Sequence, residues 1–204
     1  MKKTFKAQNT AISTGQSRSA KMVADILNEM DVFATVLDYG CGTGRNIEYL
    51  VKNISTDNTI VGVDTKEQEE RSNRKWSDIM AENKNTALIN LGMLEILRGN
   101  CFDVILNSHV LNVIDDLEVR EMIVKNIYKL LISNGKAVFE VRTDVEKNAT
   151  EKNWETYGDG YVTPTNTFQK QFSKEELEKL LVDAGFKIEQ HICNKSHHIV
   201  VASK

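Results

Sequence analysis

The feature that most constrains this chain is the stretch 36–46, VLDYGCGTGRN, in which three glycines stand at alternate positions between an apolar pair and a helix-like run. Glycine adopts positive φ at little cost, and its missing Cβ lets the backbone approach a ligand closely. The helix that follows presents unpaired backbone N–H groups at its start. The stretch therefore predicts a buried strand that turns tightly into a helix at a ligand-binding site. The alternative is that the glycines only shape a tight turn.

The length and composition indicate one globular unit. The chain has 204 residues, enough for one domain with a sizeable core and slightly short for two. We expect a polar N-terminal arm or lid over residues 1–18 and a single domain over 19–204. Hydrophobic residues make up 41% and charged residues 27%, which excludes a largely disordered chain. The net charge of −3 argues against a surface wholly committed to nucleic acid, although a local basic patch remains compatible with it.

Neither a membrane segment nor a cysteine framework is indicated. No apolar run approaches the roughly 18 residues that a membrane span needs, so we expect a cytoplasmic protein without a membrane partner. The three cysteines, Cys41, Cys101 and Cys193, lie far apart and form no C-x-x-C pair, which argues against disulfides and against a zinc site. We therefore expect no metal, and we expect Cys41 to offer its backbone to the ligand rather than its sulfur.

Apolar runs alternate with helical periodicity along most of the chain. After the strand of the glycine stretch, further strands are expected at 59–64, 86–91, 101–107, 137–142, 186–192 and 197–202. Helices are expected at 19–30, 46–53, 116–131 and 173–185. This alternation predicts a parallel α/β sheet whose loops gather at one edge. The last two strands read as an antiparallel hairpin, in which His197 and His198 point to opposite faces and so do not share a metal.

Two polar segments interrupt this pattern. Residues 65–85 are expected to form a solvated helix and loop that has little to bury beyond Trp76 and Ile79. Residues 143–171 are polar, aromatic and glycine-containing, with little regular pattern. Such a long segment inside a compact domain is usually functional or mobile, so we expect an acceptor-binding loop over the site. A solvated excursion anchored by a few aromatic residues is the alternative.

The glycine stretch carries a resemblance to a known family. Its spacing differs from the G-x-G-x-x-G of dinucleotide-binding proteins and lacks the Gly-Lys-Ser/Thr ending of a phosphate-binding loop. Residues 38–44, DYGCGTG, instead resemble the first motif of the Rossmann-like S-adenosylmethionine-dependent methyltransferases. The resemblance implies a mostly parallel seven-stranded sheet with a C-terminal antiparallel hairpin and helices on both faces, and S-adenosylmethionine as cofactor. It implies that the cofactor is bound by Asp38, Tyr39, Gly40, Cys41, Gly42, Gly44 and Asn46.

The ends of the second and third strands complete the implied cofactor site. Asp64 lies 20 residues after Gly44, where an acid in Rossmann-like sites accepts hydrogen bonds from ribose hydroxyls, and Thr65 follows it. Asp64 could instead cap the next helix. Many relatives carry an Asp after the third strand that contacts the adenine amino group. Here Asn90, or the backbone near Gly92 and Met93, takes that place, and an Asn side chain can serve the same edge.

The exit of the fourth strand is expected to line the reaction pocket. Asn107, Ser108 and His109 lie at this tip, which in this architecture faces the methyl donor and acceptor. Methyl transfer from a sulfonium needs orientation more than acid–base groups. If the acceptor is a hydroxyl or an acidic N–H, His109 is the best candidate for the base; otherwise it packs or caps the turn. Arg142, at the next strand tip, could hold an acidic acceptor or pair with Glu140 or Asp144.

A narrower similarity concerns the acceptor. Segments 8–13, 38–42, 110–114, 141–144 and 167–169 are similar to phage and bacterial methyltransferases linked to DNA modification, including those that accompany phosphorothioation. However, the fourth-strand exit lacks the D/N/S-P-P-Y/F motif of enzymes that methylate exocyclic amines in DNA. We therefore expect a methyltransferase with an unresolved acceptor, with DNA, RNA or a modified base favoured. The alternatives are a small-molecule methyltransferase and a cofactor-binding interaction module without catalysis. The oligomeric state is not indicated.

Overall fold

The computed structural model describes residues 5, 18–30, 33–94, 96 and 99–204. Most of the predicted N-terminal arm, residues 1–18, lies outside these ranges, so that domain boundary stays a prediction. Within the arm, the ring of Phe5 lies 4.9 Å from the ring of Tyr157, centroid to centroid.

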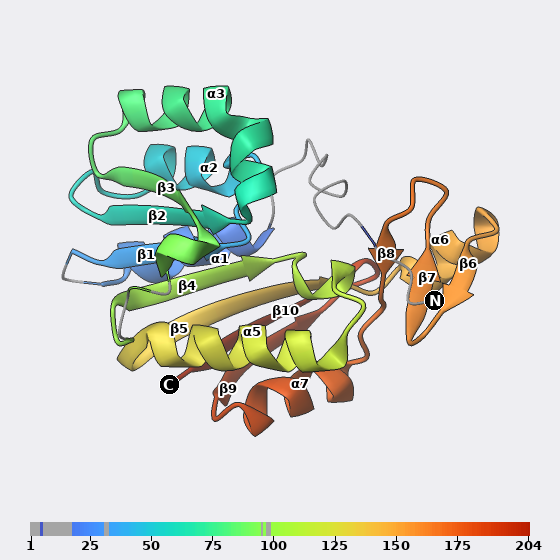
Figure 1. Cartoon of the computed structure of the whole chain (residues 1–204). Helices are drawn as coiled ribbons and strands as arrows, with labels where there is room; N and C mark the ends of the chain where they lie inside the picture. Colours follow the sequence, from blue (N-terminus) through green and yellow to red (C-terminus); the bar gives the residue numbers. More distant parts are fainter. Residues whose placement is uncertain (1–4, 6–17, 31–32, 95, 97–98) are drawn as a thin grey trace.

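A seven-stranded sheet forms the centre of the molecule, in the order β3-β2-β1-β4-β5-β10-β9 (Figure 1). Its strands are β1 Thr35–Tyr39, β2 Thr59–Asp64, β3 Thr86–Asn90, β4 Phe102–Ser108, β5 Leu131–Arg142, β9 Lys187–Cys193 and β10 His197–Ser203. The strands from β3 to β5 pair in parallel, whereas β10 is antiparallel to both β5 and β9. The predicted mostly parallel sheet with a C-terminal antiparallel hairpin is therefore confirmed.

Helices cover both faces of this sheet (Figure 1). One face packs against α1 Arg18–Asn28, α2 Arg45–Asn53 and α3 Lys66–Glu82. The other packs against α4 Leu91–Leu94, α5 Leu117–Leu130 and α7 Lys174–Asp183. Neighbouring strand residues enter opposite cores: Leu37 contributes to the α5 side and Val36 to the α1 side. Strands buried on both faces need continuous apolar runs, which is why β1 and β4 were recognisable in the sequence.

The polar segment 65–85 packs on the sheet through one helix. Helix α3 runs through almost all of it, and Gln68, Ser72, Trp76 and Ile79 form its buried face. The indole Nε1 of Trp76 donates a hydrogen bond to the carbonyl oxygen of Gly42 at 3.0 Å. The expectation of a solvated helix and loop that buries Trp76 and Ile79 is confirmed, and Gln68 and Ser72 extend its buried face.

Strand β5 begins earlier than predicted. Residues 132–136, which separate the predicted helix 116–131 from the predicted strand 137–142, lie inside it, and α5 ends at Leu130. The pairing with β4 shifts register between Phe102 and Val104, and Asn134 adopts a φ of 65°. Residues 132–136 therefore form an irregular stretch within the strand.

The segment 143–171 also has regular structure that the sequence did not reveal. It contains α6 Val145–Glu151 and a separate three-stranded sheet of β6 Glu155–Tyr157, β7 Gly160–Val162 and β8 Phe168–Gln169. Figure 1 shows this small sheet beyond the carboxyl ends of the parallel strands. Strands of two or three residues are too short to produce a recognisable alternation, which explains the missed prediction.

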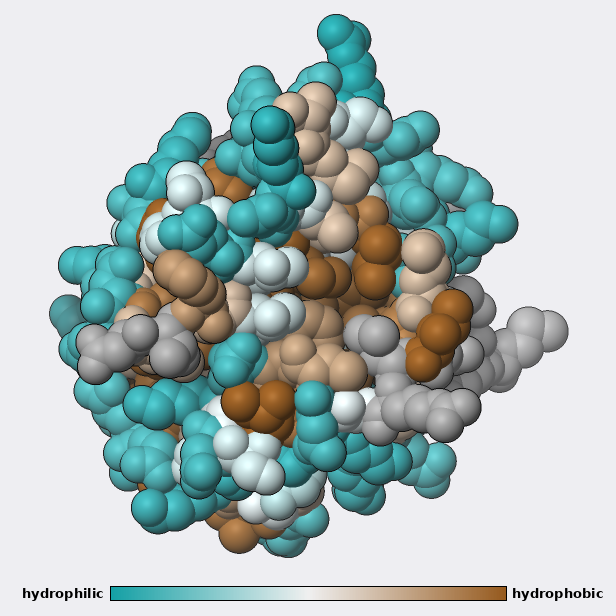
Figure 2. All heavy atoms as spheres, turned by 90° about the vertical axis from the view of Figure 1, so that its left-hand side faces the viewer, coloured by the Kyte–Doolittle hydropathy of each residue, from teal (hydrophilic) through white to brown (hydrophobic). Residues whose placement is uncertain are grey.

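The opposite edge of the molecule lies at the amino ends of the parallel strands. Figure 2 shows hydrophilic side chains around its rim and hydrophobic ones gathered toward its centre. Phe33, just before β1, is 71% exposed, and Ile96 is 77% exposed. Among the helices of the described residues, none is long and apolar enough to cross a bilayer.

Candidate active site

The glycine turn is held by its own backbone and by close neighbours. The N–H groups of Gly40 and Cys41 donate to the carbonyl oxygen of Val63 at 2.8 and 3.0 Å, which joins the turn to β2. Gly40 has a φ of 85°, and a Cβ there would lie 2.2 Å from Cγ2 of Val110. Gly44 has a φ of 83°, and its Cβ would lie 2.6 Å from Cδ1 of Ile79. Both positions therefore require glycine for conformation and for space.

Asp64 joins the end of β2 to this turn. Its Oδ2 accepts a hydrogen bond from the N–H of Gly42 at 2.7 Å, and its Oδ1 accepts one from the N–H of Thr65 at 2.7 Å. The N-cap of α3 is Thr65, whose hydroxyl accepts from the N–H of Gln68, so Asp64 is not the capping residue. Burial raises the pKa of Asp64, and the two backbone N–H groups act in the opposite direction. Each carboxylate oxygen keeps a lone pair for a further donor.

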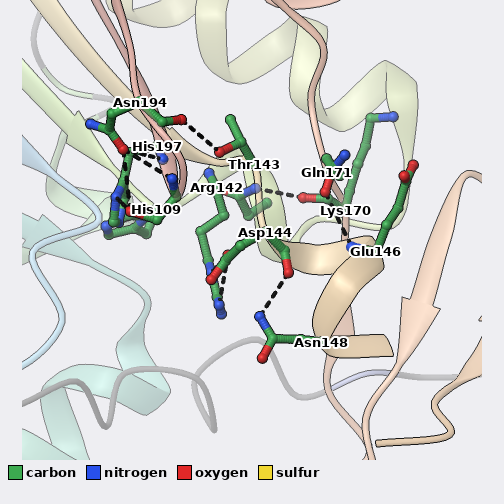
Figure 3. Close-up of polar contacts among 12 residues, drawn as sticks. His109, Arg142, Thr143, Asp144, Glu146, Asn148, Lys170, Gln171, Asn194 and His197 are labelled. Carbon is green, nitrogen blue, oxygen red and sulfur yellow. Dashed lines mark hydrogen bonds and ion pairs between the residues drawn. The ribbon is translucent and has the colours of Figure 1, made fainter. Parts of the chain in front are cut away.

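A cavity of about 580 Å³ opens at the carboxyl ends of the parallel strands. Its volume falls in the usual range for sites that bind small molecules and cofactors. It is bounded by the glycine turn, by the ends of β2, β4 and β5, by the residue after β3, by the start of α5 and by the start of β10. Its apolar lining residues are Leu91, Val110, Val113, Ile114, Val119, Met122 and Ile123. Its polar lining residues include Arg45, His109, Asn112, Arg142, Asp144, Gln169 and His197. Of these, His109, Arg142, Asp144 and His197 lie together in Figure 3, and we call this group the polar end of the cavity.

Most of the predicted site residues meet at this cavity. The lining includes Tyr39, Gly40, Cys41, Gly42, Asn46, Asp64, Thr65, Ser108, His109 and Arg142. Six predicted residues lie outside the lining, namely Asp38, Gly44, Asn90, Gly92, Met93 and Asn107. Burial raises the pKa of the Cys41 thiol well above its ordinary value, so its sulfur stays protonated while its backbone holds the turn.

The polar side chains outside the lining form hydrogen bonds elsewhere in the structure. The side-chain amide of Asn90 donates to Oε2 of Glu69 at 2.9 Å. That of Asn107 donates to the carbonyl oxygen of Tyr39 at 3.1 Å. Leu91, rather than Gly92 or Met93, provides the cavity wall after β3. An adenine contact from Asn90 therefore stays a prediction that requires its side chain to leave Glu69.

Asp38 lies buried within β1, directly before the glycine turn. The side chain is fully buried. Burial and the negative charge of Asp64 raise the pKa of Asp38 to about 7, although a hydrogen bond from the Asn46 side chain and the charge of Arg45 act in the opposite direction. Because a buried carboxyl group costs free energy unless it is hydrogen-bonded, the contact with Asn46 makes Asp38 a supporting group beneath the glycine turn.

Glu140 organises the polar end of the cavity. Its Oε2 accepts hydrogen bonds from the hydroxyls of Ser19 at 2.5 Å and Ser108 at 2.9 Å. Its Oε1 faces Nε2 of His109 at 3.7 Å and Nε2 of His197 at 4.0 Å. Figure 3 shows the two imidazoles side by side, with ring centroids 5.1 Å apart. Glu140 itself is 1% exposed and lies behind the histidines that reach the cavity.

Burial and charge set the protonation of these groups. Burial lowers the pKa of His109 to about 4, although the negative charge of Glu140 acts in the opposite direction. Burial also lowers the pKa of His197. For Glu140, burial raises the pKa, but His109 and the two serine hydroxyls outweigh it and leave the pKa below its ordinary value. At neutral pH the site therefore holds a carboxylate behind two neutral imidazoles.

Arg142 and Asn112 position the remaining polar wall. Nε and Nη2 of Arg142 contact Oδ1 of Asp144 at 2.9 and 2.8 Å, so the predicted alternative of a salt bridge is what the structure shows (Figure 3). Oδ1 of the buried Asn112 accepts from the N–H of Arg142 at 2.9 Å, and its Nδ2 donates to the carbonyl oxygen of Lys170 at 2.5 Å. Asn112 thereby brings Gln169 to the cavity.

No role in the site was predicted for Asn112 or His197, and Glu140 was considered only as a partner of Arg142. Glu140 could have been found from its place near the end of a strand. Gln169 lies in the segment 143–171, which was expected to form a loop over the site, and it lines the cavity together with Asp144.

Comparison with known proteins then identifies the family. A family model described as a methyltransferase domain matches residues 13–191. The chain belongs to this family. It is an S-adenosylmethionine-dependent methyltransferase, and the predicted cofactor is confirmed. No curated protein sequence matches this methyltransferase, and the narrower resemblance to DNA-modification enzymes is not confirmed.

Solved structures share the fold of this methyltransferase. Burkholderia thailandensis 1,6-didemethyltoxoflavin-N1-methyltransferase, with bound 1,6-didemethyltoxoflavin and S-adenosylhomocysteine, is 20% identical with a TM-score of 0.67, over 92% of this chain and 78% of that one. A Methanosarcina mazei S-adenosylmethionine-dependent methyltransferase is 16% identical with a TM-score of 0.69, over 88% and 96%. The [4+2]-cyclase SpnF is 16% identical with a TM-score of 0.65, over 90% and 80%. At these identities the likeness shows the fold alone.

Proposed function

We propose that this methyltransferase modifies a small polar molecule bound between His109, Arg142, Gln169 and His197. The observation that carries the proposal is that these four side chains line the same cavity as the glycine turn. The cavity has the size of a small-molecule site. The 1,6-didemethyltoxoflavin bound in the Burkholderia thailandensis neighbour supports this class of acceptor.

The charge distribution supports a small acceptor over nucleic acid. Duplex or single-stranded nucleic acid is held mainly by free cations that contact phosphates. At the polar end of this cavity, the guanidinium of Arg142 is already paired with Asp144, and Glu140 adds a buried negative charge. The net charge of the chain is −3. The predicted preference for DNA or RNA therefore gives way to the small-molecule alternative.

The glycine turn and Asp64 fit S-adenosylmethionine. Gly40 and Gly42 of the turn line the cavity with positive φ angles, and Asp64 lines it beside them from the end of β2. Asp64 would hold the ribose hydroxyls, the turn 40–42 the amino-acid part, and Leu91 an apolar wall for the base. When bound, the cofactor supplies a methyl group on a positively charged sulfur that leaves as a neutral thioether.

His109 would accept a proton from the acceptor where one has to be removed. It is neutral at physiological pH because burial lowers its pKa to about 4. Its Nε2 faces the carboxylate of Glu140, which stabilises the imidazolium that forms when His109 takes up a proton. Glu140 is therefore a positioning residue, and Arg142 with Asp144 orients a polar group of the acceptor.

A second candidate function is cofactor binding without methyl transfer. It is favoured by one observation: a protein described as a [4+2]-cyclase has this fold. The two candidates differ in whether a methyl group leaves the donor.

Radiolabelled methyl donor, incubated with the purified protein and separate pools of DNA, RNA, protein and metabolites, distinguishes them. We expect label in the metabolite pool, and loss of that label in Asp64→Ala. Label in DNA or RNA would contradict the small acceptor. Tight donor binding with label in none of the pools would support the second candidate.

A further inference from the structure

Three side chains of types that bind metals lie within 4.8 Å of one another on the β9–β10 hairpin, namely His191, Cys193 and His198. The hairpin lies beside α7 (Figure 1). His191 and Cys193 are two residues apart on β9 and so point to the same face. His198 on β10 pairs directly with Cys193, and His191 pairs with Val200. Val200 packs in the core with Leu177 of α7, which fixes the face. We refer to His191, Cys193 and His198 as the hairpin cluster.

The hairpin cluster is separate from the active site. His197 and His198 are adjacent on β10, and the prediction that they point to opposite faces is confirmed. Nε2 of His197 faces Glu140 at 4.0 Å, whereas Nδ1 of His198 lies 3.0 Å from Nε2 of His191. Residues of the hairpin cluster do not line the cavity described above.

The donor atoms of the hairpin cluster lie within 4.8 Å of one another. Nδ1 of His191 lies 2.7 Å from Oε1 of Glu178, an acceptor, so in the neutral ring this nitrogen carries the proton and Nε2 keeps a lone pair for a metal. Nδ1 of His198 lies 3.0 Å from that Nε2 and 3.1 Å from Sγ of Cys193. A proton on Nδ1 of His198 can point at Nε2 of His191 or at Sγ of Cys193, but not at both. A cation placed between the three atoms would bind all of them.

The arrangement matches the ligand chemistry of zinc. Imidazole nitrogens bind Zn²⁺ at about 2.0–2.1 Å and thiolates at about 2.3 Å, which places tetrahedral ligands about 3.3–3.6 Å apart. The separations of 3.0 and 3.1 Å from Nδ1 of His198 need to widen by only a few tenths of an ångström, and the third pair of donor atoms lies within 4.8 Å. The contact between Glu178 and His191 is the carboxylate–histidine pair that commonly supports a zinc ligand.

Nearby charges favour a cation. Glu175 and Glu178 of α7 act on His198 as negative charges, and Lys174 opposes them. Cys193 is exposed, which leaves the site open to solvent.

We propose that His191, Cys193 and His198 bind one Zn²⁺ ion, with Glu178 as the supporting hydrogen-bond acceptor. Three protein ligands leave a fourth position for water. The ion would tie the edge strand β9 to β10 and, through Glu178, to α7. This differs from the expectation of no metal, because the pairing of β9 with β10 brings together residues that form no metal motif in the sequence.

Titration of the metal-free full-length protein with Co²⁺ tests the site, because a cobalt–thiolate bond produces a near-ultraviolet charge-transfer band. We expect one equivalent to produce this band and Zn²⁺ to displace the cobalt and remove it. Cys193→Ser should abolish the band, and His191→Asn should weaken binding at least tenfold. Glu178→Gln should weaken it roughly 10- to 100-fold. Thermal unfolding of the metal-free variants shows that each is folded.

Matched controls separate this site from others. Cys101→Ser should keep the full band, because Cys101 lies outside the cluster and contacts the carbonyl oxygen of Gly99. Cobalt binding without a thiolate band, lost in His197→Asn and kept in His191→Asn, would assign the metal to the pair facing Glu140 and overturn the proposal. Absence of stoichiometric binding in the folded wild-type protein would also overturn it.

Discussion

The N–H of Gly42 donates to the carboxylate of Asp64 at 2.7 Å, so the glycine turn after β1 and the end of β2 form one unit. Both residues line the cavity at the carboxyl edge of the sheet. This contact places a backbone turn and a carboxylate on one side of the cavity, as a nucleoside with an amino-acid tail requires.

Asp64→Ala should weaken S-adenosylmethionine binding by about 1.5–3 kcal/mol, the value of a lost charged hydrogen bond. Isothermal titration calorimetry measures this as an increase in Kd of about 10- to 150-fold. Asp78→Asn, an exposed position on α3, is the matched control and should leave Kd unchanged. Equal affinities for Asp64→Ala and wild type would remove Asp64 from the cofactor site.

Gly40→Ala should destabilise the fold through two effects. A non-glycine residue at a φ of 85° is strained by about 1–2 kcal/mol, and the new Cβ meets Val110, which adds about 1–3 kcal/mol of overpacking. Gly158→Ala is the matched control, because it has a φ of 55° but nothing within 4 Å of its Cβ. Urea unfolding should show the larger loss for Gly40→Ala. Similar losses would mean that the contact with Val110 relaxes freely.

His109 should titrate well below the ordinary pKa of histidine. NMR should give His109 a pKa of about 4, because its burial disfavours the imidazolium. Glu140→Gln should lower that pKa further, since the negative charge that favours the imidazolium is removed. Glu189→Gln changes an exposed glutamate that pairs with Lys187 and should have no effect. A pKa of His109 near the ordinary histidine value, or a pKa that Glu140→Gln leaves unchanged, would contradict this prediction.

Asp38 should make stability depend on pH. Its folded pKa of about 7 lies above the ordinary value of 3.8, so between these values the folded state binds more protons than the unfolded state. The free energy of unfolding should therefore fall with rising pH across this window, by at most about 1.4 kcal/mol per pH unit. His109, with a lowered pKa, acts in the opposite direction below its ordinary value.

The difference between wild type and Asp38→Asn isolates the contribution of Asp38. Denaturant unfolding at a series of pH values should show wild type losing stability relative to Asp38→Asn from about pH 4 to 7 and no further change above it. A constant difference across that range would mean that Asp38 is ionised throughout.

The sequence predicted the features that depend on local pattern. The glycine turn and Asp64 were found because each follows an apolar strand at a characteristic spacing. The polar end of the cavity was harder to predict, because it depends on contacts between segments that are distant in the chain. Ser19 and Glu140, which share a hydrogen bond, are 121 residues apart. The same holds for Trp76 and Gly42, which meet only after α3 packs on the sheet.

A crystal structure of the protein with S-adenosylhomocysteine tests the central claim most directly. We expect the ribose hydroxyls within hydrogen-bond distance of Asp64, the amino-acid part along residues 40–42, and the sulfur directed toward His109 and His197. A nucleoside bound elsewhere, or one in this cavity without a contact to Asp64, would contradict this account of the site.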